Sequence, residues 1–510
     1  MTDGRLRSMT QDNPDNDRLT ELRQRETLRE YVFTSRVPVV GGWVARAREL
    51  WNGVATKWQA RPVMEQQSAF NRALVDWLER PAGLAELDDL FAHADRGQTR
   101  LNRATSRLTL DRVNFDRPQH GGRPKIAYFS PLPPARSGIA DYSAELLPYL
   151  AERADVTLFA DDPSAVTLSG FISRPACDFP SCHADYDLPL YQMGNSDQHE
   201  TVYTMLRQYP GVVVLHDYFL HHFIRHRTIG RGDWTGYGVE MGYALGHEGR
   251  RLARAVHRER AEAPLFDAPL NQRVIDAALG IIVHSRFAAE RVRRYRPDVP
   301  LAVIPALVEP HAGVSLRSRL NLPEDAVLFG SFGQMTPGKR IDAALGAFRD
   351  ARRSSPQAHY LLVGEALPGV DLAGLLAAPE LNGVVHHVGY VAELAEFINW
   401  IHTVDVVVNL RQPTAGETSA VALRALAAGR PLIVYDHGWY SELPDAAALK
   451  VPPGDEAALR QAMTALAHSA ERRRAMGRAG REYVRDFCAP ERVAQAYLAF
   501  LQTVMEPARV

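Results

Sequence analysis

The feature that most constrains the fold of this chain is a repeated alternation of short apolar runs with helical patterns, which begins at Lys125. Apolar runs of about four to eight residues, separated by amphipathic helices, are typical of parallel sheets whose two faces are covered by helices. We therefore predict a first α/β domain over residues 123–305. Its predicted strands are KIAYFS (125–130), DVTLFADD (155–162), LPLYQM (188–193), GVVVLHD (211–217) and GIIVHS (280–285).

The same alternation starts again after LAVIPALVEP (301–310), which predicts a second α/β domain over residues 306–480. Residues 481–510 are helical and amphipathic, and we expect them to pack across both domains. Ligands of such sheets bind beyond the carboxyl ends of the strands, so two facing Rossmann-like domains would enclose a cleft. The predicted strands of the second domain are AVLFGSFG (326–333), HYLLVGE (359–365), VVHHVGYV (384–391), DVVVNL (405–410), PLIVYD (431–436) and ALKVPP (448–453).

The N-terminal region has a different pattern. Residues 1–20 are polar and are predicted to be a disordered tail, whereas residues 21–116 have the apolar spacing of helices and no strand pattern. Within them, residues 37–63 mix three tryptophans with arginines and a lysine. Such a segment suits a membrane interface, and it equally suits packing against the catalytic body or a second subunit. Both alternatives stay open at this point.

Composition excludes several classes of protein. The 510 residues carry a net charge of −1, which gives no global reason to expect nucleic-acid binding. No apolar run approaches the roughly 18 residues of a membrane span, and the polar N-terminal stretch lacks the apolar segment expected of a signal peptide. The three cysteines, Cys177, Cys182 and Cys488, form no disulfide framework. A zinc site at Cys177, Cys182 and His183 would need a second cluster of ligands, which the sequence does not offer. From the cysteine usage we predict a reduced, cytoplasmic protein, and we expect neither a metal nor a cofactor.

Three loops that follow predicted strands are candidate ligand sites. In PLPPARSGIADYS (131–143), Ser137 and Gly138 precede a helix, where they permit a tight turn or contact a phosphate or sugar. The spacing of a dinucleotide-binding loop is absent there. In GSFGQMTPGKR (330–340), three glycines allow a close approach to a diphosphate, and Lys339 and Arg340 supply positive charge. The alternative for this second loop is a solvated basic turn.

The third loop lies in RQPTAGETSAVALRALAAGRPLIVYDHGW (411–439), between a strand and a helix. The positive end of a helix dipole and its free N–H groups favour an anion at that point. Thr418 or Ser419 can cap the helix, but capping does not explain Glu417, because a carboxylate repels a phosphate unless it has another task. Accepting hydrogen bonds from sugar hydroxyls is such a task. The loop therefore indicates a ligand that carries both a diphosphate and a sugar.

In their order and spacing, these motifs resemble the large family-4 retaining glycosyltransferases of GT-B fold. The resemblance covers residues 125–510 and includes a variant subgroup pattern, PTAGETS followed by RALAAG. It implies two Rossmann-like domains that hold a nucleotide sugar between them, with no metal and no cofactor. The motifs that carry it are SPLPPARSGIADYSAELLPYL, VVVLHD, IIVHS, VIPALVEP, SFGQMTPGKRIDAALGAF, LLVGE and PTAGETSAVALRALAAGRPLIV.

The resemblance implies roles for individual residues. Lys339 matches the lysine that neutralises the donor diphosphate, Glu417 stands one position late for the glutamate on the transferred sugar, and His216 matches a histidine near the anomeric centre. These three are the predicted catalytic residues. An alternative role for His216 is that of a general base. The predicted donor-binding residues are Ser137, Gly138, Gly333, Gln334, Lys339, Arg340, Arg411, Glu417, Thr418, Ser419 and Arg424. For the acceptor we predict the first domain, with Asn195, Asp217 and His221.

Two positions depart from the family pattern. Arg424 replaces a second glutamate that usually contacts the donor ribose, and Gln334 replaces the arginine that usually partners the lysine. We hypothesise that Arg340 or Arg411 restores the lost positive charge. The function implied is transfer of a sugar to a hydroxyl acceptor with retention of anomeric configuration. By analogy with polysaccharide or glycolipid assembly, we expect a lipid-linked acceptor and a location at the inner face of the cell membrane. The alternatives are a sugar-nucleotide epimerase and a degenerate binding or scaffolding protein.

Overall fold

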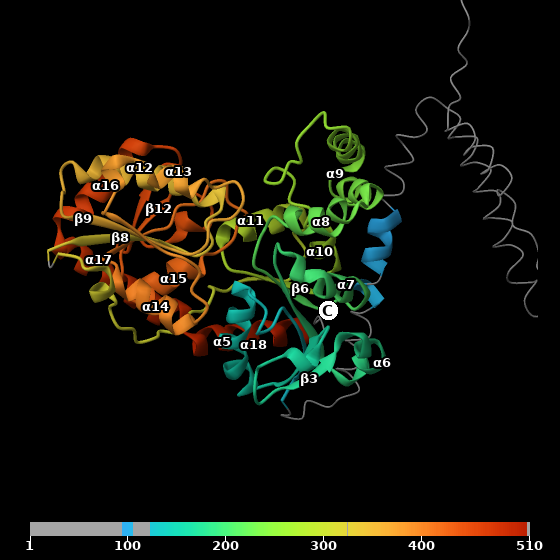
Figure 1. Ribbon diagram of the computed structural model, residues 1–510. Helices are drawn as coiled ribbons and strands as arrows, with labels where there is room; N and C mark the ends of the chain where they lie inside the picture. The colour runs from blue at the N-terminus through green and yellow to red at the C-terminus, as the bar shows by residue number, and fades with distance from the viewer. Residues whose placement is uncertain (1–93, 102, 106–122, 324, 507–510) are drawn as a thin grey trace, which may run out of the picture. The chain divides into compact units, whose positions relative to one another are not determined.

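The structure of the protein, a computed structural model, describes residues 94–101, 103–105, 123–323 and 325–506. These residues belong to one compact unit and contain two parallel sheets, each covered by helices (Figure 1). The predictions for residues 1–93 and 106–122 lie outside the described residues. Of the predicted N-terminal helices, residues 94–101 and 103–105 are described, and they are helical.

The first domain is built on a seven-stranded sheet in the order β3-β2-β1-β4-β5-β6-β7, with every neighbouring pair parallel. Its central strands are buried, because helices cover both faces. The sequence analysis did not include β3, an edge strand without an apolar run, whose Ile172 is 69% exposed. The strands are β1 (Lys125–Phe129), β2 (Asp155–Ala160), β3 (Ile172–Pro175), β4 (Leu188–Met193), β5 (Val212–Leu215), β6 (Gly280–Val283) and β7 (Leu301–Val303).

The second domain has a six-stranded sheet in the order β10-β9-β8-β11-β12-β13, again parallel throughout. Figure 1 shows α12, α13 and α16 on one side of β8 and β9, and α14, α15 and α17 on the other. Its strands lie within the predicted runs, except that β9 begins one residue earlier, at Ala358. They are β8 (Val327–Phe332), β9 (Ala358–Val363), β10 (Val385–Val388), β11 (Val406–Val408), β12 (Leu432–Tyr435) and β13 (Ala448–Val451).

The helices connect successive strands as the alternation predicts. In the first domain they are α5 (Gly138–Ala151), α6 (Phe179–Cys182), α7 (Glu200–Gln208), α8 (His221–Arg227), α9 (Trp234–His257), α10 (Gln272–Ala277) and α11 (Arg286–Tyr295). In the second domain they are α12 (Ile341–Arg352), α13 (Leu372–Leu376), α14 (Leu394–Thr403), α15 (Ala420–Ala427), α16 (Glu456–His468) and α17 (Ala470–Tyr483).

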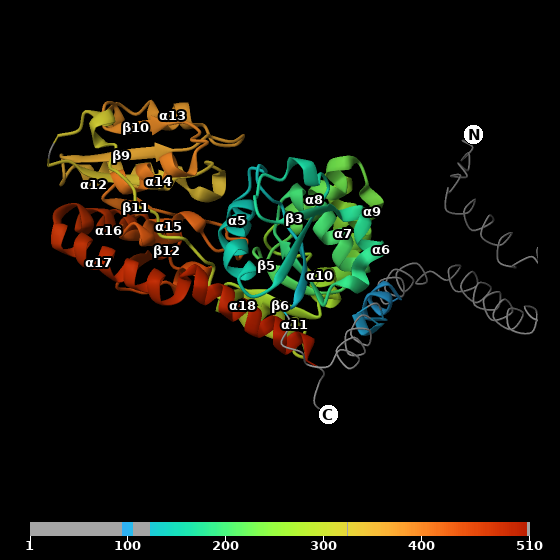
Figure 2. The same ribbon diagram turned by 90° about the horizontal axis from the view of Figure 1, so that it is seen from below.

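The last helix, α18 (Pro490–Met505), returns to the first domain. It packs against α5 (Figure 2). The hydroxyls of Tyr142 and Tyr497 lie 2.7 Å apart at this contact. The preceding helix, α17, packs on α15 in the second domain. Residues 470–505 therefore contact both domains.

The two domains also meet at the loops that follow their strands. The backbone N–H of Phe219 donates to the carbonyl of Ala415 across the domain boundary (2.9 Å). The Glu442 carboxylate of the second domain accepts from the N–H groups of Arg286 and Phe287 (2.9 and 2.8 Å), at the start of α11. These contacts hold the carboxyl ends of the two sheets opposite each other, which is where the predicted site residues lie.

Candidate functional site

A cleft of about 780 Å³ lies between the two domains, within the size range of small-molecule sites. Its walls come from the loops after β1, β4 and β5 on one side and from the loops after β8 and β11 on the other. Of the predicted residues, those that line it are Ser137, Gly138, Asn195, His216, Asp217, Gln334, Arg411, Glu417, Thr418 and Arg424.

The carboxylate of Glu417 is oriented by its own loop. Arg411 Nε lies 2.7 Å from Glu417 Oε1, and the hydroxyl of Thr414 donates to Oε2 (2.8 Å). Gly416 has a φ of 72°, and a Cβ at this position would lie 2.7 Å from the Cβ of Tyr218. Glycine is therefore required for the loop to bring Glu417 this close to the first domain.

The start of α15 faces the cleft beside this carboxylate. Ser419 is the N-cap: its hydroxyl accepts from the N–H of Ala422 (3.2 Å) and from the side-chain amide of Asn409 (2.8 Å). The capping alternative is thus observed for Ser419, whose side chain is buried, while Thr418 lines the cleft. A capped helix start still offers free N–H groups and a partial positive charge to an anion.

Lys339 lies beneath the loop that follows β8. Its ammonium donates to the carbonyl of Phe332 (2.6 Å), close to Gly333, where an added Cβ would lie 2.7 Å from Lys339 Nζ. Burial, with a smaller contribution from the Arg411 guanidinium, lowers the pKa of Lys339 to about 7. A negative ligand would favour the protonated amine and raise this pKa again.

The two arginines that were expected to restore positive charge lie in different places. Arg411 lines the cleft and pairs with Glu417. Arg340 has a φ of 49°, and its guanidinium turns to Asp342 (2.9 Å) and to the side-chain oxygen of Gln412 (3.2 Å). Only Arg411 of the two lines the cleft, because Arg340 is held by an acid two residues further on.

His216 is enclosed by protein partners. Its Nε2 lies 2.7 Å from the Gln192 side-chain oxygen, and its Nδ1 lies 3.2 Å from Nε2 of His284. Burial first, then the neighbouring His284 and His199, lower the pKa of His216 well below its ordinary value. The ring borders the cleft as a neutral group, with both nitrogens already within hydrogen-bond distance of the protein.

Asp217, the next residue, follows β5 and faces the second domain. The backbone N–H of Asn195 donates to its Oδ2 (2.8 Å). Burial raises the pKa of Asp217 to about 7, and the Glu417 carboxylate adds to this rise; the Asn195 N–H and Arg411 oppose it. Asp217 and Glu417 therefore form a pair of acids that come from different domains and influence each other across the cleft.

His221 does not reach the cleft, contrary to the acceptor prediction. Its Nδ1 lies 2.9 Å from the carbonyl of Ala268 and its Nε2 lies 2.8 Å from the hydroxyl of Tyr237, so the ring is buried inside the first domain. The next residue, His222, lines the cleft instead. Successive side chains on an α-helix differ in direction by about 100°. The sequence pattern did not indicate which of the two neighbouring histidines of α8 faces the cleft.

Arg424 lies one turn into α15 and pairs with Glu145 of α5 at 2.5 Å. Both side chains are about nine-tenths buried, and both border the cleft. The second carboxylate oxygen of Glu145 accepts from the backbone N–H of Glu309 (3.2 Å). Sequence analysis missed Glu145, although it lies seven residues after Gly138 and so shares its helical face.

Ser137 and Gly138 form the start of α5 on the opposite wall. The Ser137 hydroxyl accepts from the N–H of Ile139 (3.2 Å), which caps the helix. Two helix starts, those of α5 and α15, therefore border one cleft from opposite sides. Their dipoles reinforce each other at an anion between them.

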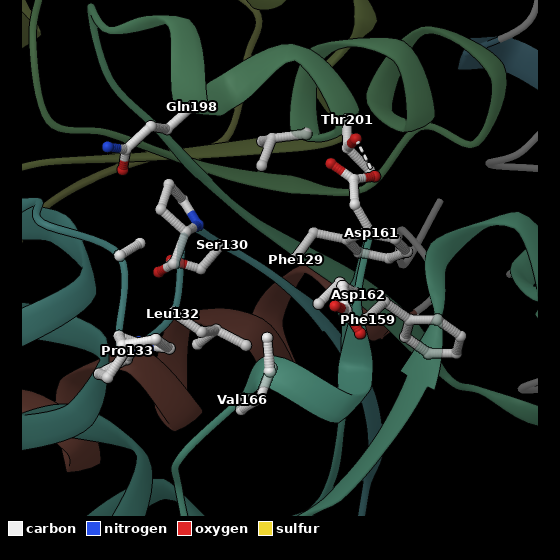
Figure 3. Close-up of a pocket in the computed structure, with 16 residues that line it drawn as sticks. Phe129, Ser130, Leu132, Pro133, Phe159, Asp161, Asp162, Val166, Gln198 and Thr201 are labelled. Atoms are coloured by element: carbon white, nitrogen blue, oxygen red, sulfur yellow. Dashed lines mark hydrogen bonds between the residues drawn. The ribbon is translucent and has the colours of Figure 1, made fainter.

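A second, smaller pocket of about 410 Å³ lies at the carboxyl ends of β1 and β2. Figure 3 shows its apolar floor, which includes Phe129 and Phe159, and its polar rim of Gln198, Asp161 and Asp162. The Thr201 hydroxyl donates to Asp161 Oδ1 (2.5 Å). The loop from Pro131 to Ser137 lines this pocket at one end and the cleft at the other.

Two further kinds of site were searched in the described part of the chain. Among residues 94–101, 103–105, 123–323 and 325–506, no three histidine, cysteine or acidic side chains gather as a metal-binding group. None of the helices that the structure describes combines the length and apolarity of a membrane span.

Comparison with known proteins agrees with this arrangement. Residues 326–469 match the family model of the group 1 glycosyl transferases. No curated protein matches the chain in sequence. Among solved structures, Anabaena HepE in complex with UDP is similar, with a TM-score of 0.54 and 17% identity, over 74% of this chain and 100% of that one. The structure of HepE in complex with UDP-glucose gives a TM-score of 0.54 and 15% identity, over 75% of this chain and 100% of that one.

The sucrose-phosphate synthase of Thermosynechococcus elongatus gives a TM-score of 0.50 and 21% identity, over 75% of this chain and 99% of that one. At these identities, the likeness concerns the fold. The arrangement of two parallel sheets around a cleft is therefore the GT-B fold, as the sequence analysis predicts.

Proposed function

We propose that this chain, a group 1 glycosyltransferase of GT-B fold, transfers a sugar from a nucleoside-diphosphate sugar to a hydroxyl acceptor with retention of anomeric configuration. The observation that carries the proposal is the charge arrangement around the start of α15. Arg411 and the helix start line the cleft and suit a diphosphate, and Glu417, oriented by Arg411 and Thr414, suits the hydroxyls of the attached sugar. Lys339 lies behind the cleft wall with a pKa of about 7, and a bound diphosphate would favour its protonated form.

The demanding step is departure of the nucleoside diphosphate, because negative charge builds on its phosphate oxygens. In this proposal, protonated Lys339, the free N–H groups of α15 and the start of α5 stabilise that charge. Preorganised donors of this kind lower the barrier because they need no reorientation as the charge develops. Lys339 is well suited to the task, since its ammonium is already held by the carbonyl of Phe332.

The acceptor binds against the first domain in this proposal. The loop from Pro131 to Ser137 contributes residues to both the cleft and the pocket of Figure 3, and we propose this side of the first domain for a longer acceptor. The carboxylates of Asp161 and Asp162 and the amide of Gln198 at the rim of this pocket suit the hydroxyl groups of sugars. We place the reaction in polysaccharide or glycolipid assembly at the cytoplasmic side of a membrane, by analogy alone.

Thermal unfolding in the presence of UDP-, GDP-, dTDP- and ADP-sugars tests the donor. A ligand that binds the folded state raises the unfolding temperature by mass action. We expect a rise with one class of nucleotide sugar, first tested with UDP-glucose, and loss of that rise in Lys339→Met. Release of nucleoside diphosphate that depends on an added acceptor then distinguishes a transferase from an epimerase. Donor binding with no release across the panel would instead favour the degenerate binding protein.

A further inference from the structure

We propose that His222 and Phe266 form a binding subsite for a sugar ring of the acceptor, on the first-domain wall of the cleft. The inference rests on the proposed transfer function and names the class of acceptor, a glycoside whose terminal ring lies against these two side chains. Both residues line the cleft, beside Asn195. Their rings meet edge to face, with centroids 5.5 Å apart and ring planes at 65°.

The hydrogen bonds around Asn195 fix the position of the proton on the His222 ring. The side-chain oxygen of Asn195 accepts from the backbone N–H of Phe223 (3.0 Å), so its amide nitrogen is the atom that lies 3.2 Å from His222 Nδ1. An amide nitrogen donates, and Nδ1 therefore accepts with its lone pair. Burial, with a smaller contribution from Arg225, lowers the pKa of His222, which favours this neutral ring. The ring proton consequently lies on Nε2.

The Nε2–H group of His222 is available to a ligand. It has no hydrogen-bond partner among the residues that the structure describes, and the half-buried ring lines the cleft. Because the group is a neutral donor, it matches an uncharged acceptor atom, such as a hydroxyl oxygen or the ring oxygen of a sugar. The subsite thus offers one oriented hydrogen bond before a substrate arrives.

Phe266 is held in place by the loop that carries it, which follows α9. This loop is tied to the start of α8: the N–H of Leu220 donates to the carbonyl of Pro269 (2.8 Å), and Nδ1 of His221 lies 2.9 Å from the carbonyl of Ala268. Phe266 itself is half-buried and lines the cleft. His221 therefore supports the loop of this subsite from inside the domain and does not contact a ligand.

An aromatic ring beside an N–H donor is a combination that suits a pyranose. The C–H groups on one face of a pyranose ring are apolar and slightly positive, so they pack on the negative face of an aromatic ring. Its hydroxyls need hydrogen-bond partners, which a few polar groups in a binding site supply. Both groups of the subsite are uncharged, which favours a neutral sugar over a phosphate.

The subsite lies next to the place proposed for the donor sugar. Asn195, whose amide holds His222, donates its backbone N–H to Asp217 Oδ2 (2.8 Å). Burial first, and then the Glu417 carboxylate across the cleft, raise the pKa of Asp217, so these two acids lie near each other. Glu417 is the residue proposed to hold the donor sugar. An acceptor ring at His222 and Phe266 would therefore lie beside that sugar, on the opposite wall.

The test uses the full-length protein with UDP-, GDP-, dTDP- and ADP-sugars as donors and simple glycosides as acceptors. The acceptors are the methyl glycosides of glucose, galactose, mannose and N-acetylglucosamine. Release of nucleoside diphosphate is measured with each glycoside, with glycerol and in water alone. We expect at least one glycoside to raise the release above its rate in water. Glycerol should raise it less, because it carries hydroxyls but no ring.

Four variants then separate the two contacts. His222→Phe keeps an aromatic ring but removes the N–H donor, and Phe266→Ala removes the stacking face. Each should raise the KM for the glycoside by about 3–10-fold, with the effect on KM rather than kcat, because the ground state and the transition state both make the contact. His222→Gln can still donate and Phe266→Trp keeps an aromatic face, so each should recover part of the loss.

Two measurements show that the variants act on the acceptor alone. The rise in unfolding temperature that the donor causes reports on folding and on the donor site, and it should be kept in all four variants. The matched control is His226→Phe, an exposed histidine four residues further along α8, which should keep the wild-type KM.

The inference would be overturned by a release that no glycoside raises above its rate in water. Equal KM values for the glycoside in the wild type, His222→Phe and Phe266→Ala would also overturn it. Loss of the donor-induced shift in Phe266→Ala would assign the ring to the donor sugar instead, against the inference. Failure of the proposed function looks different, because the wild type itself would then release no nucleoside diphosphate from any donor, in water or with an acceptor.

Discussion

Arg424 of α15 and Glu145 of α5 form an ion pair of 2.5 Å that joins the two domains beside the cleft, with both side chains about nine-tenths buried. The arginine that appears as a departure from the family pattern in the sequence is thus matched by an acid 279 positions away in the chain. Whether this pair also contacts a donor stays a prediction. Its structural consequence can be tested directly.

Arg424→Ala should destabilise the protein by about 3 kcal/mol, because it leaves the buried Glu145 carboxylate without its cation. Chemical denaturation monitored by circular dichroism measures this loss. The double variant Arg424→Met with Glu145→Leu removes both charges and should recover most of the stability. If the double variant were as unstable as Arg424→Ala, lost packing rather than an orphaned charge would be the cause.

Donor affinity should fall as pH rises above about 7. In the free protein the pKa of Lys339 is about 7, and a bound diphosphate raises it, so binding at higher pH requires the uptake of a proton. The expected slope is about tenfold in Kd per pH unit, up to the pKa of the complex. Calorimetric titration in buffers of different ionisation enthalpy measures the proton taken up. A Kd that is constant between pH 6.5 and 9 would contradict a role for Lys339 at the diphosphate.

Asp217→Asn should stabilise the protein at pH 8. An acid whose pKa is raised on folding keeps more protons than the unfolded chain, so its presence costs stability as pH rises from about 4 to about 7. Above pH 7 the cost is complete, and its removal should add roughly 1–3 kcal/mol, because the side chain remains partly solvated. Below pH 4 both proteins should be equally stable by denaturant titration.

Gly333→Ala should weaken donor binding. Gly333 has a φ of 79°, and a Cβ there would lie 2.7 Å from Lys339 Nζ, so the ammonium would have to move. The matched control is Gly383→Ala, which has a similar φ of 74° but no atom within 4 Å of the added Cβ. Both variants should lose about 1 kcal/mol of stability to backbone strain, and only Gly333→Ala should lower donor affinity. Equal affinity in the two variants would argue against Lys339 as a ligand.

The sequence by itself determined the class of fold and most of the loops at the cleft. Buried parallel strands such as β5 and β6 are apolar throughout, so the local composition of the sequence predicts their positions. Their carboxyl ends meet at one edge of each sheet, which is why Asp217 and Glu417 could be singled out from their places after a strand. The edge strand β3 escaped the analysis because it is not buried on both faces and carries no such run.

Only the tertiary structure decided which side chains meet. The pairing of Arg424 with Glu145, the approach of Asp217 to Glu417 and the choice of His222 over His221 at the cleft depend on the rotation of helices and on how two domains face each other. A local pattern specifies the period of an element, whereas such contacts depend on packing between segments hundreds of residues apart. Electrostatic interactions act through space, so the pKa values of Lys339 and Asp217 follow from those contacts and not from sequence neighbours.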